Sequence, residues 1–320
     1  MKIVIDPLLK TLSLWAEGDE IQKVTGKIGC GANDSERIYT FRNPKLLTDL
    51  AAMNRLPSFL RDAISKLYQF DGRTTEYDGV SVWWSETRYP GVWAPSIDTV
   101  VFASALRKRL MQTKYISRFS TLLEIGCGSG FLTKYVMMKK QEKDQRDFNK
   151  VPLMDINKDA IKCALDTLQD IRGETEIVYT HNRIQSPLHI SHPYDLVLCN
   201  PPYIPRPSAR DNNPFEGLFL YYEILQNASK LLSGRGLLFI TFSSLSEDVV
   251  LPEFRKYFSL RPVAHMRVPL KIPSVFSQLS TESKQWVKYL ESKKGLEVDR
   301  SERSGYRYWE RITVMECRYL

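Results

Sequence analysis

The four residues from Asn200 to Tyr203 have the types and order to bind a flat amino group. They read Asn-Pro-Pro-Tyr and directly follow an apolar stretch, 194–199, that is typical of a buried strand. The two prolines fix two φ angles and remove two backbone donors, and the first favours an extended Asn200. The resulting stiff turn would offer carbonyl acceptors, an amide and an aromatic ring to an –NH2 group. The structural alternative is a rigid strand-to-helix loop with Tyr203 in the core.

A glycine-rich turn upstream could hold a ligand close to the backbone. The segment from Glu124 to Gly130 reads Glu-Ile-Gly-Cys-Gly-Ser-Gly, at the end of another predicted strand. Glycine permits a sharp turn, and free N–H groups at the start of the next helix can bind a ligand. Phe131 stands where the dinucleotide pattern G-x-G-x-x-G has its third glycine. The Glu124 carboxylate would repel a pyrophosphate and attract an ammonium, which favours a ligand that carries an amino acid.

Polar residues follow the next two predicted strands. Asp155 comes after strand 151–154, where an acid can accept both hydroxyls of a ribose. The alternative for Asp155 is a residue near the N-cap of the next helix. Asn182 follows strand 176–179, where a polar side chain could contact an adenine edge. With the glycine turn, these positions favour a nucleoside-containing ligand.

The hydrophobic pattern indicates the elements that position these residues. We expect helices at 99–111, 130–140, 157–169, 216–232, 246–257 and 281–294, and strands at 121–125, 151–154, 176–179, 194–199, 237–242, 265–270 and 309–317. This alternation predicts an α/β fold with a Rossmann-like, doubly wound, mostly parallel seven-stranded sheet. Ligands bind such sheets at the carboxyl ends of the strands. We expect the last strand to be an edge or antiparallel strand.

The region before this alternation differs from the rest. Residues 45–70 have helical periodicity, and residues 77–93 contain β-formers around Asp78 and Gly79 that are typical of a hairpin. We expect a helical and hairpin region at 1–95, to which the family resemblance described below assigns substrate recognition. A cofactor-binding domain would follow at 96–320, with an insertion at about 271–308.

Composition limits the class of protein. The 320 residues are 43% hydrophobic and 26% charged, as in ordinary soluble domains. We see no apolar run of membrane-spanning length and no signal peptide, and the five scattered cysteines lack metal-ligand spacing. We therefore expect a cytoplasmic protein with reduced thiols, no metal site and no membrane partner. The net charge of +8 is compatible with a nucleic acid or another acidic partner. The alternative is that the basic charge reflects no specific partner, as in many soluble proteins.

The order of the motifs resembles the class I S-adenosylmethionine-dependent methyltransferases. In that family, Asn-Pro-Pro-Tyr is typical of enzymes that methylate adenine N6 or glutamine N5. Residues 90–99, Pro-Gly-Val-Trp-Ala-Pro-Ser-Ile-Asp-Thr, and 216–225, Glu-Gly-Leu-Phe-Leu-Tyr-Tyr-Glu-Ile-Leu, resemble the HemK or release-factor glutamine methyltransferases. Three features depart from that family. Ser96-Ile97 replaces Arg-Pro, Asn182 replaces an acid, and residues 271–308 are extra or different.

The resemblance implies S-adenosyl-L-methionine as cofactor and a role for each matching residue. It implies catalysis by Asn200, Pro201 and Tyr203, and substrate contacts by Asn200, Pro202, Tyr203 and Pro95. It implies cofactor contacts by Glu124, Gly126, Cys127, Gly128, Gly130, Asp155, Ile156, Asn182, Asn200 and Thr99. The predicted reaction is methylation of a glutamine amide in a protein, such as a translation factor.

Three other functions stay open. The basic charge suits an N6-adenine methyltransferase of DNA or RNA, and Trp83 and Trp84 beside Arg88 could stack on bases, although we prefer to place them in the hairpin. A small-molecule N-methyltransferase could use residues 271–308 as a lid. An inactive cofactor-binding scaffold is disfavoured by the intact 200–203 motif. We expect a protein partner rather than nucleic acid, and the sequence does not decide the oligomeric state.

Overall fold

A computed structural model of the chain defines the fold. It describes the segments 2–6, 11–15, 23–27, 37–40, 73–85, 88–93, 95–111, 115–142, 148–171, 173, 175–181, 190–205, 217–270, 281–298 and 307–320. The predicted helical segment 45–70 and Asn182 lie outside these residues. Within them, no helix has both the length and the apolar character needed to cross a membrane.

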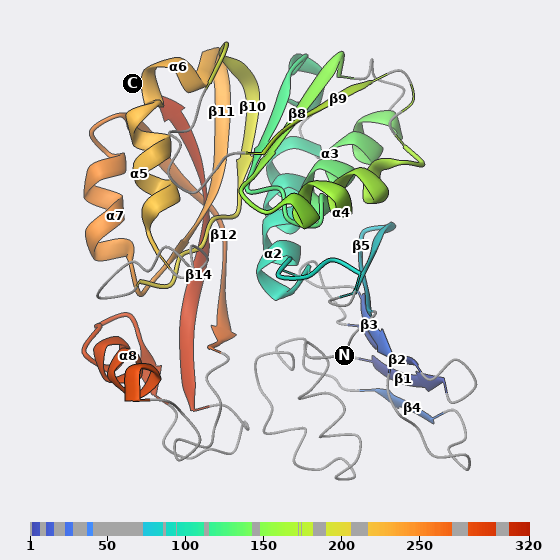
Figure 1. Cartoon of the computed structure of the whole chain (residues 1–320), viewed down its shortest axis with the longest axis vertical. Coiled ribbons are helices and arrows are strands. Elements are labelled where there is room, and N and C mark those ends of the chain that lie inside the picture. The colour runs from blue at the N-terminus through green and yellow to red at the C-terminus, as the bar shows by residue number, and fades with distance from the viewer. Residues whose placement is uncertain are drawn as a thin grey trace.

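Among the described residues, the central sheet has the predicted doubly wound form but eight strands instead of the predicted seven (Figure 1). The additional strand is short, Glu297–Val298, and lies in the predicted insertion. The strands of the sheet are β7 (Leu122–Ile125), β8 (Lys150–Asp155), β9 (Glu176–His181), β10 (Tyr194–Cys199), β11 (Leu232–Ser243), β12 (Phe258–Pro269), β13 (Glu297–Val298) and β14 (Tyr308–Tyr319). The main order is β12-β14-β11-β10-β7-β8-β9, and β13 pairs only with β14. The last strand, β14, runs antiparallel to both neighbours, as expected, but it lies inside the sheet, and β12 is the edge.

Helices cover both faces of this sheet (Figure 1). One face carries α2 (Ile97–Leu106), α3 (Phe131–Gln141) and α4 (Lys158–Leu168), and the other carries α5 (Phe219–Gln226), α6 (Ala228–Leu231) and α7 (Glu247–Phe254). Successive side chains of a strand point to opposite faces. In β10, Leu196 and Leu198 accordingly join the core under α2 to α4, whereas Val197 and Cys199 join the core under α5 to α7. Burial on both faces explains why residues 196–199 of this strand are all apolar.

The predicted helix 216–232 is broken in the structure. Helix α5 ends at Gln226 and α6 begins at Ala228, because Asn227 between them leaves the helical conformation. Its side-chain amide donates to the Glu223 carbonyl at 2.9 Å, which competes with the helical backbone bonds. Strand β11 then begins at Leu232, five residues before the predicted 237, with a register shift beside Tyr194.

Two other predicted elements also have different boundaries. The prediction placed a strand at 265–270, but the corresponding strand β12 begins at Phe258, with a register shift near Pro262. An edge strand and a bulge both tolerate proline, which a propensity pattern counts against a strand. The predicted helix 99–111 is α2 followed by a π-helical turn, Arg107–Met111. The predicted polar helix of the C-terminal insertion is present as α8 (Thr281–Glu291).

The N-terminal region contains a second, antiparallel sheet. Its strands are β1 (Lys2–Asp6), β2 (Thr11–Trp15), β3 (Lys23–Lys27), β4 (Arg37–Thr40), β5 (Arg73–Tyr77) and β6 (Val80–Trp84), in the order β4-β1-β2-β3-β5-β6. The predicted hairpin is β5–β6, turning at Asp78 and Gly79. The strands β1 to β4 were not predicted, because each apolar run is short and gains its partners only from the sheet.

The hairpin is attached to the main domain by polar contacts. The Tyr135 hydroxyl on α3 donates to Asp78 at 2.9 Å, and the Thr75 hydroxyl donates to the Pro95 carbonyl at 2.8 Å. Pro95 lies just before α2, so the hairpin supports the start of this helix. The division at residues 95 and 96 remains a prediction.

We predict that a buried ion pair stabilises the sheet through its strand β14. Glu316 is buried and accepts hydrogen bonds from Arg109 and Arg318. Burial alone would raise the pKa of Glu316, but the two arginines outweigh it and hold the pKa below its usual value. Glu316→Ala would remove a buried carboxylate that accepts from both Arg109 and Arg318, and should lower the free energy of unfolding by about 3 kcal/mol.

Urea denaturation measures this loss. The matched control is Glu253→Ala, which removes an exposed pair with Lys256 at 2.6 Å and should cost less than about 1 kcal/mol. Equal losses in the two variants would contradict a stabilising role for the Glu316 cluster.

Candidate active site

The register of β10 gathers the predicted site residues at one edge of the sheet. Cys199, the last residue of β10, pairs with Ile125 at the end of β7 and with Ile240 in β11. The next residues, Asn200 and Gly126, therefore leave neighbouring strands at the same level. The carboxyl ends of β7, β8 and β10 form one edge, where ligands bind in sheets of this kind.

The glycine turn has the backbone that its sequence predicts. Gly126, Gly128 and Gly130 have φ angles of 70°, 49° and 73°, which side chains other than glycine rarely adopt. The N–H groups of Gly126 and Cys127 donate to the Met154 carbonyl of β8 at 2.8 and 3.1 Å. The turn is thus joined to the neighbouring strand and leads directly into α3.

Asp155 links the glycine turn to the next loop. Its Oδ2 accepts the Gly128 N–H at 3.0 Å, and its Oδ1 accepts the Asn157 N–H at 2.9 Å. Asn157, rather than Asp155, caps α4, since its side chain accepts the Asp159 N–H at 2.9 Å. Asp155 therefore has a structural role in the loop, at the same edge where the ribose contact was predicted. That contact stays a prediction.

Glu124 is a buried residue of β7 that bonds to the first turn of α3. Its Oε2 accepts both the N–H and the hydroxyl of Thr133. Burial is the largest effect on this carboxyl group and raises its pKa to about 8, against the hydrogen bonds from Thr133 that lower it. A carboxyl group in this state gains most when a cation approaches, because the cation favours its charged form. The predicted contact with an ammonium is compatible with this position and stays a prediction.

Asn200 is oriented by an acid from α2. Its Nδ2 donates to Asp98 Oδ2 at 2.8 Å, and the Ser96 hydroxyl donates to the other Asp98 oxygen. The Oδ1 of Asn200 is buried and has no hydrogen-bond partner in the structure. A buried acceptor without a partner costs about 1–3 kcal/mol, so this position is suited to a donor supplied by a ligand.

Tyr203 is both a core residue and part of this polar group. Its ring packs against the cores on the two faces of the sheet, as the structural alternative expected. Its hydroxyl also forms a hydrogen bond with Asp98. Burial, followed by the negative charges of Asp98 and Glu310, raises the pKa of Tyr203 well above its usual value. The hydroxyl therefore remains protonated and donates.

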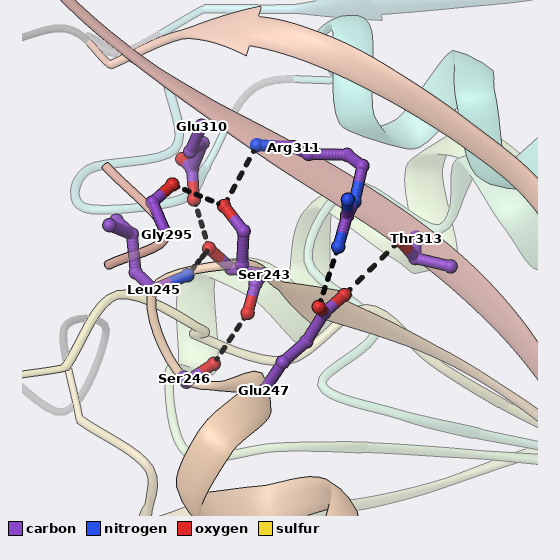
Figure 2. Close-up of polar contacts among 9 residues, drawn as sticks. Ser243, Leu245, Ser246, Glu247, Gly295, Glu310, Arg311 and Thr313 are labelled. Atoms are coloured by element: carbon purple, nitrogen blue, oxygen red, sulfur yellow. Dashed lines mark hydrogen bonds and ion pairs between the residues drawn. The ribbon is translucent and has the colours of Figure 1, made fainter. Parts of the chain in front are cut away.

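Glu310 is a second buried acid near Asp98. It lies at the start of β14, is 2% exposed, and accepts the Ser243 hydroxyl (Figure 2). The Ser243 oxygen in turn accepts the Leu245 N–H at 3.0 Å, which directs its proton to Glu310. Burial is the largest effect on Glu310, and with the nearby Asp98 it raises the pKa to about 7.

The C-terminal insertion packs beside the same loop. The Trp286 indole of α8 donates to the Pro205 carbonyl at 3.0 Å, two residues after Tyr203. Past the end of α8, the Gly295 carbonyl accepts the Ser244 hydroxyl at 2.7 Å (Figure 2). Leu245, Val287, Leu290 and Tyr308 form a small apolar core here, with Ile204 packed against it. The insertion thus supports the loop that follows the Asn-Pro-Pro-Tyr segment.

The remaining predicted site residues lie near the carboxyl ends of the strands, except Asn182, which is outside the described residues. Thr99 is in the first turn of α2, where its hydroxyl accepts the Ser96 N–H at 3.3 Å. Pro95, Cys127 and Pro201 are buried, whereas Pro202 and Ile156 are partly exposed. None of their predicted ligand contacts is tested, and Asn182 is not described. The sequence-based prediction did not include Asp98 and Glu310. Each is an acid within a largely apolar segment, a helix start for Asp98 and a strand for Glu310, and this pattern could have indicated them.

We predict that Gly130 tolerates alanine less well than Gly126. Both have positive φ, which costs a substituted alanine about 1–2 kcal/mol. At Gly130, a Cβ would also lie 2.9 Å from the Ala164 Cα of α4, whereas at Gly126 the nearest atom is a flexible Leu220 methyl at 3.6 Å. Gly130→Ala should therefore lose about 1–3 kcal/mol more unfolding free energy than Gly126→Ala. Urea denaturation of both variants tests this, and equal losses would refute the close contact.

We also predict that the ligand-free protein becomes less stable as the pH rises. The pKa values of Glu124 and Glu310, about 8 and about 7, lie above the ordinary 4.5, so the folded state holds their protons longer. The stabilisation that the two protonated groups contribute is complete at a pH below their pKa in the unfolded chain. It is lost as the pH rises through their pKa in the folded protein. We expect Tm to fall by about 5 °C as the pH is raised from about 5 to about 9.

Glutamine substitutions identify the source of this pH dependence. Glu124→Gln and Glu310→Gln should each flatten the curve of Tm against pH. The exposed control Glu253→Gln should keep the slope of the unmodified protein. Slopes that match in all four proteins would show that these buried acids do not titrate in this range.

Comparison with known proteins places the chain among methyltransferases. The family model described as the methyltransferase small domain matches residues 88–257, more than half of the chain. A tRNA1(Val) (adenine(37)-N6)-methyltransferase from Photorhabdus laumondii is 28% identical over 128 residues, which cover 38% of this chain and 50% of that protein. The match therefore spans only about half of the relative's length.

Solved structures with related folds are distant in sequence. A putative RNA methyltransferase from Pyrococcus horikoshii has a TM-score of 0.41 and 11% identity, with 73% of this chain and 94% of the other covered. A ribosomal protein L11 methylase from Lactobacillus delbrueckii subsp. bulgaricus has a TM-score of 0.40 and 12% identity, with 70% and 81% covered. With its glycine turn, its doubly wound sheet and the matched family model, the chain belongs to the methyltransferase small domain family.

Proposed function

We propose that this protein methylates the N6 amino group of adenine in RNA. The observation that carries the proposal is the buried Oδ1 of Asn200, which has no partner and lies beside the proline-rigid turn and the Tyr203 ring. An exocyclic amino group would supply the missing donor. Its flat ring could then pack against Tyr203, which keeps water away.

The cofactor site proposed here consists of the glycine turn, Asp155 and Glu124. The glycines allow close approach of the ligand to the backbone, Asp155 would accept from the ribose, and Glu124 would pair with the amino-acid ammonium. When bound there, S-adenosylmethionine would supply a methyl group on a positively charged sulfur. Transfer to an amino nitrogen would form an N–C bond, leave the C–S electron pair on the neutral thioether and release one N–H proton to water.

The residues of the chain assist this reaction by position and charge. The Asn200 Oδ1 and the Pro201 carbonyl would accept the two N–H groups of the acceptor and hold its lone pair toward the methyl group. Both acceptors stabilise the positive charge that develops on the nitrogen. We assign no step to a protein nucleophile.

Three observations support adenine in RNA over the glutamine amide expected from the sequence. The relative matched over 128 residues is named as a tRNA adenine-N6 methyltransferase. The chain has a net charge of +8, which attracts a polyanion. Trp83 and Trp93 are 43% and 59% exposed, Arg88 lies 5.8 Å from the Trp83 ring centre, and such side chains can stack on bases.

We infer further that residues 1–95 and the insertion at 271–308 bind the RNA around the acceptor. The support is their attachment on either side of the site. The hairpin holds the start of α2 through Thr75 and Pro95, and α8 contacts the loop after Tyr203 through Trp286.

Transfer of a radiolabelled methyl group tests the acceptor. The protein, S-adenosylmethionine and a cell extract should give label that nuclease releases and protease does not, and the labelled nucleoside should be N6-methyladenosine. Label in protein would instead support the glutamine amide, and label in small molecules would support a biosynthetic role. Either result would overturn the proposed function.

We predict that Asn200→Ala lowers kcat at least 100-fold while the Kd for S-adenosylmethionine changes less than about threefold. The reason is that the variant loses the acceptor for the amino group but keeps the glycine turn. The control Asn227→Ala removes an amide that donates to the Glu223 carbonyl of α5, and its kcat should stay near that of the unmodified protein. An active Asn200→Ala enzyme would contradict the assigned site.

A further inference from the structure

The orientation of the Asn200 amide depends on one neighbouring side chain. A carboxylate only accepts hydrogen bonds, so the Asn200 group that faces Asp98 at 2.8 Å is the –NH2 and not the carbonyl. The carbonyl oxygen Oδ1 then faces the other way, where it is buried and without a partner.

Asp98 is itself held in place by two further donors. The Ser96 hydroxyl donates to its Oδ1, and the Tyr203 hydroxyl also bonds to the carboxylate. Asp98 lies in the first turn of α2, where the helix dipole stabilises a negative charge. One carboxylate from α2 therefore connects both polar side chains of the 200–203 turn.

We propose that Asp98 is a positioning residue that orients Asn200 and Tyr203 for the amino acceptor. This inference rests on the proposed function for the identity of the acceptor, but not for the hydrogen bonds. A charged acceptor on Nδ2 polarises the amide and makes Oδ1 a stronger acceptor, because linked hydrogen bonds reinforce one another. The same carboxylate fixes the tilt of the Tyr203 ring against which the acceptor would pack.

A simpler role for Asp98 is that of an acid at a helix N-terminus, and α7 provides the comparison. Helix α7 follows Ser246 and carries Asp248 at its second position, just as α2 follows Ser96 and carries Asp98 at its second position. Asp248 is exposed and contacts no part of the site. Asp248 therefore shares the favourable helix position but not the bond to an amide.

The test compares Asp98→Ala and Asp98→Asn with Asp248→Ala, using the RNA acceptor of the unmodified enzyme. Asp98→Ala should lower kcat about 100-fold, as expected for a misplaced acceptor, with less than about threefold change in KM or in the Kd for S-adenosylmethionine. Asp98→Asn keeps an acceptor oxygen but loses the charge, and should lower kcat about tenfold. Asp248→Ala should keep the kcat of the unmodified enzyme. An Asp98→Ala enzyme with the kcat of Asp248→Ala would overturn the proposal.

A second measurement needs neither activity nor cofactor. In 15N-labelled ligand-free protein, the Asn200 side-chain amide signal is identified by its absence in Asn200→Ala. Its protons should exchange slowly with water and shift in Asp98→Ala but not in Asp248→Ala. An unchanged amide signal in Asp98→Ala would overturn the proposal even if activity fell. If the unmodified protein methylates no RNA, the proposed function fails, while the amide signal still decides the role of Asp98.

Discussion

The parallel pairing of β10 with β7 and β11 determines where this protein can do chemistry. Cys199 ends β10 level with Ile125, and the residues that follow are the rigid Asn-Pro-Pro-Tyr turn on one strand and the glycine turn on the next. A shift of one residue would turn every side chain of β10 to the opposite face, and both faces are packed. The apolar core therefore strongly specifies the register of β10. The same register fixes the relative positions of the two turns that follow β10 and β7.

The buried acids of the sheet differ in their partners and in the direction of their pKa shifts. Glu316 has two arginine partners, which keep its pKa low and its charge in place. Glu124 and Glu310 accept hydrogen bonds from hydroxyl or N–H groups but form no ion pair with a described residue, and burial raises their pKa values. The fold thus keeps the charge of Glu316 in an ion pair. The charges of Glu124 and Glu310 instead change with pH near neutrality.

Most elements of the main domain could be predicted from the sequence, because their periodicity agrees with their tertiary environment. Strand β10 is apolar from residue 196 to its end and buried on both faces, and α4 is amphipathic with Asn157 as its cap. The errors occur where neighbours override local preference. Asn227 breaks a helix through its own side chain, and Pro262 is tolerated because β12 is an edge. The strands β1 to β4 are short and depend on sheet partners.

The sequence alone determined the reaction class, because a glycine turn and an Asn-Pro-Pro-Tyr turn are local motifs whose chemistry is carried by consecutive residues. It also located both motifs at strand ends. Only the tertiary structure brought Asp98, 102 residues earlier in the chain, into contact with Asn200. It also brought Glu310 of the last strand near Asp98 and Tyr203. These contacts depend on how α2 and β14 pack on the sheet, and the orientation of the Asn200 amide is therefore a property of the fold.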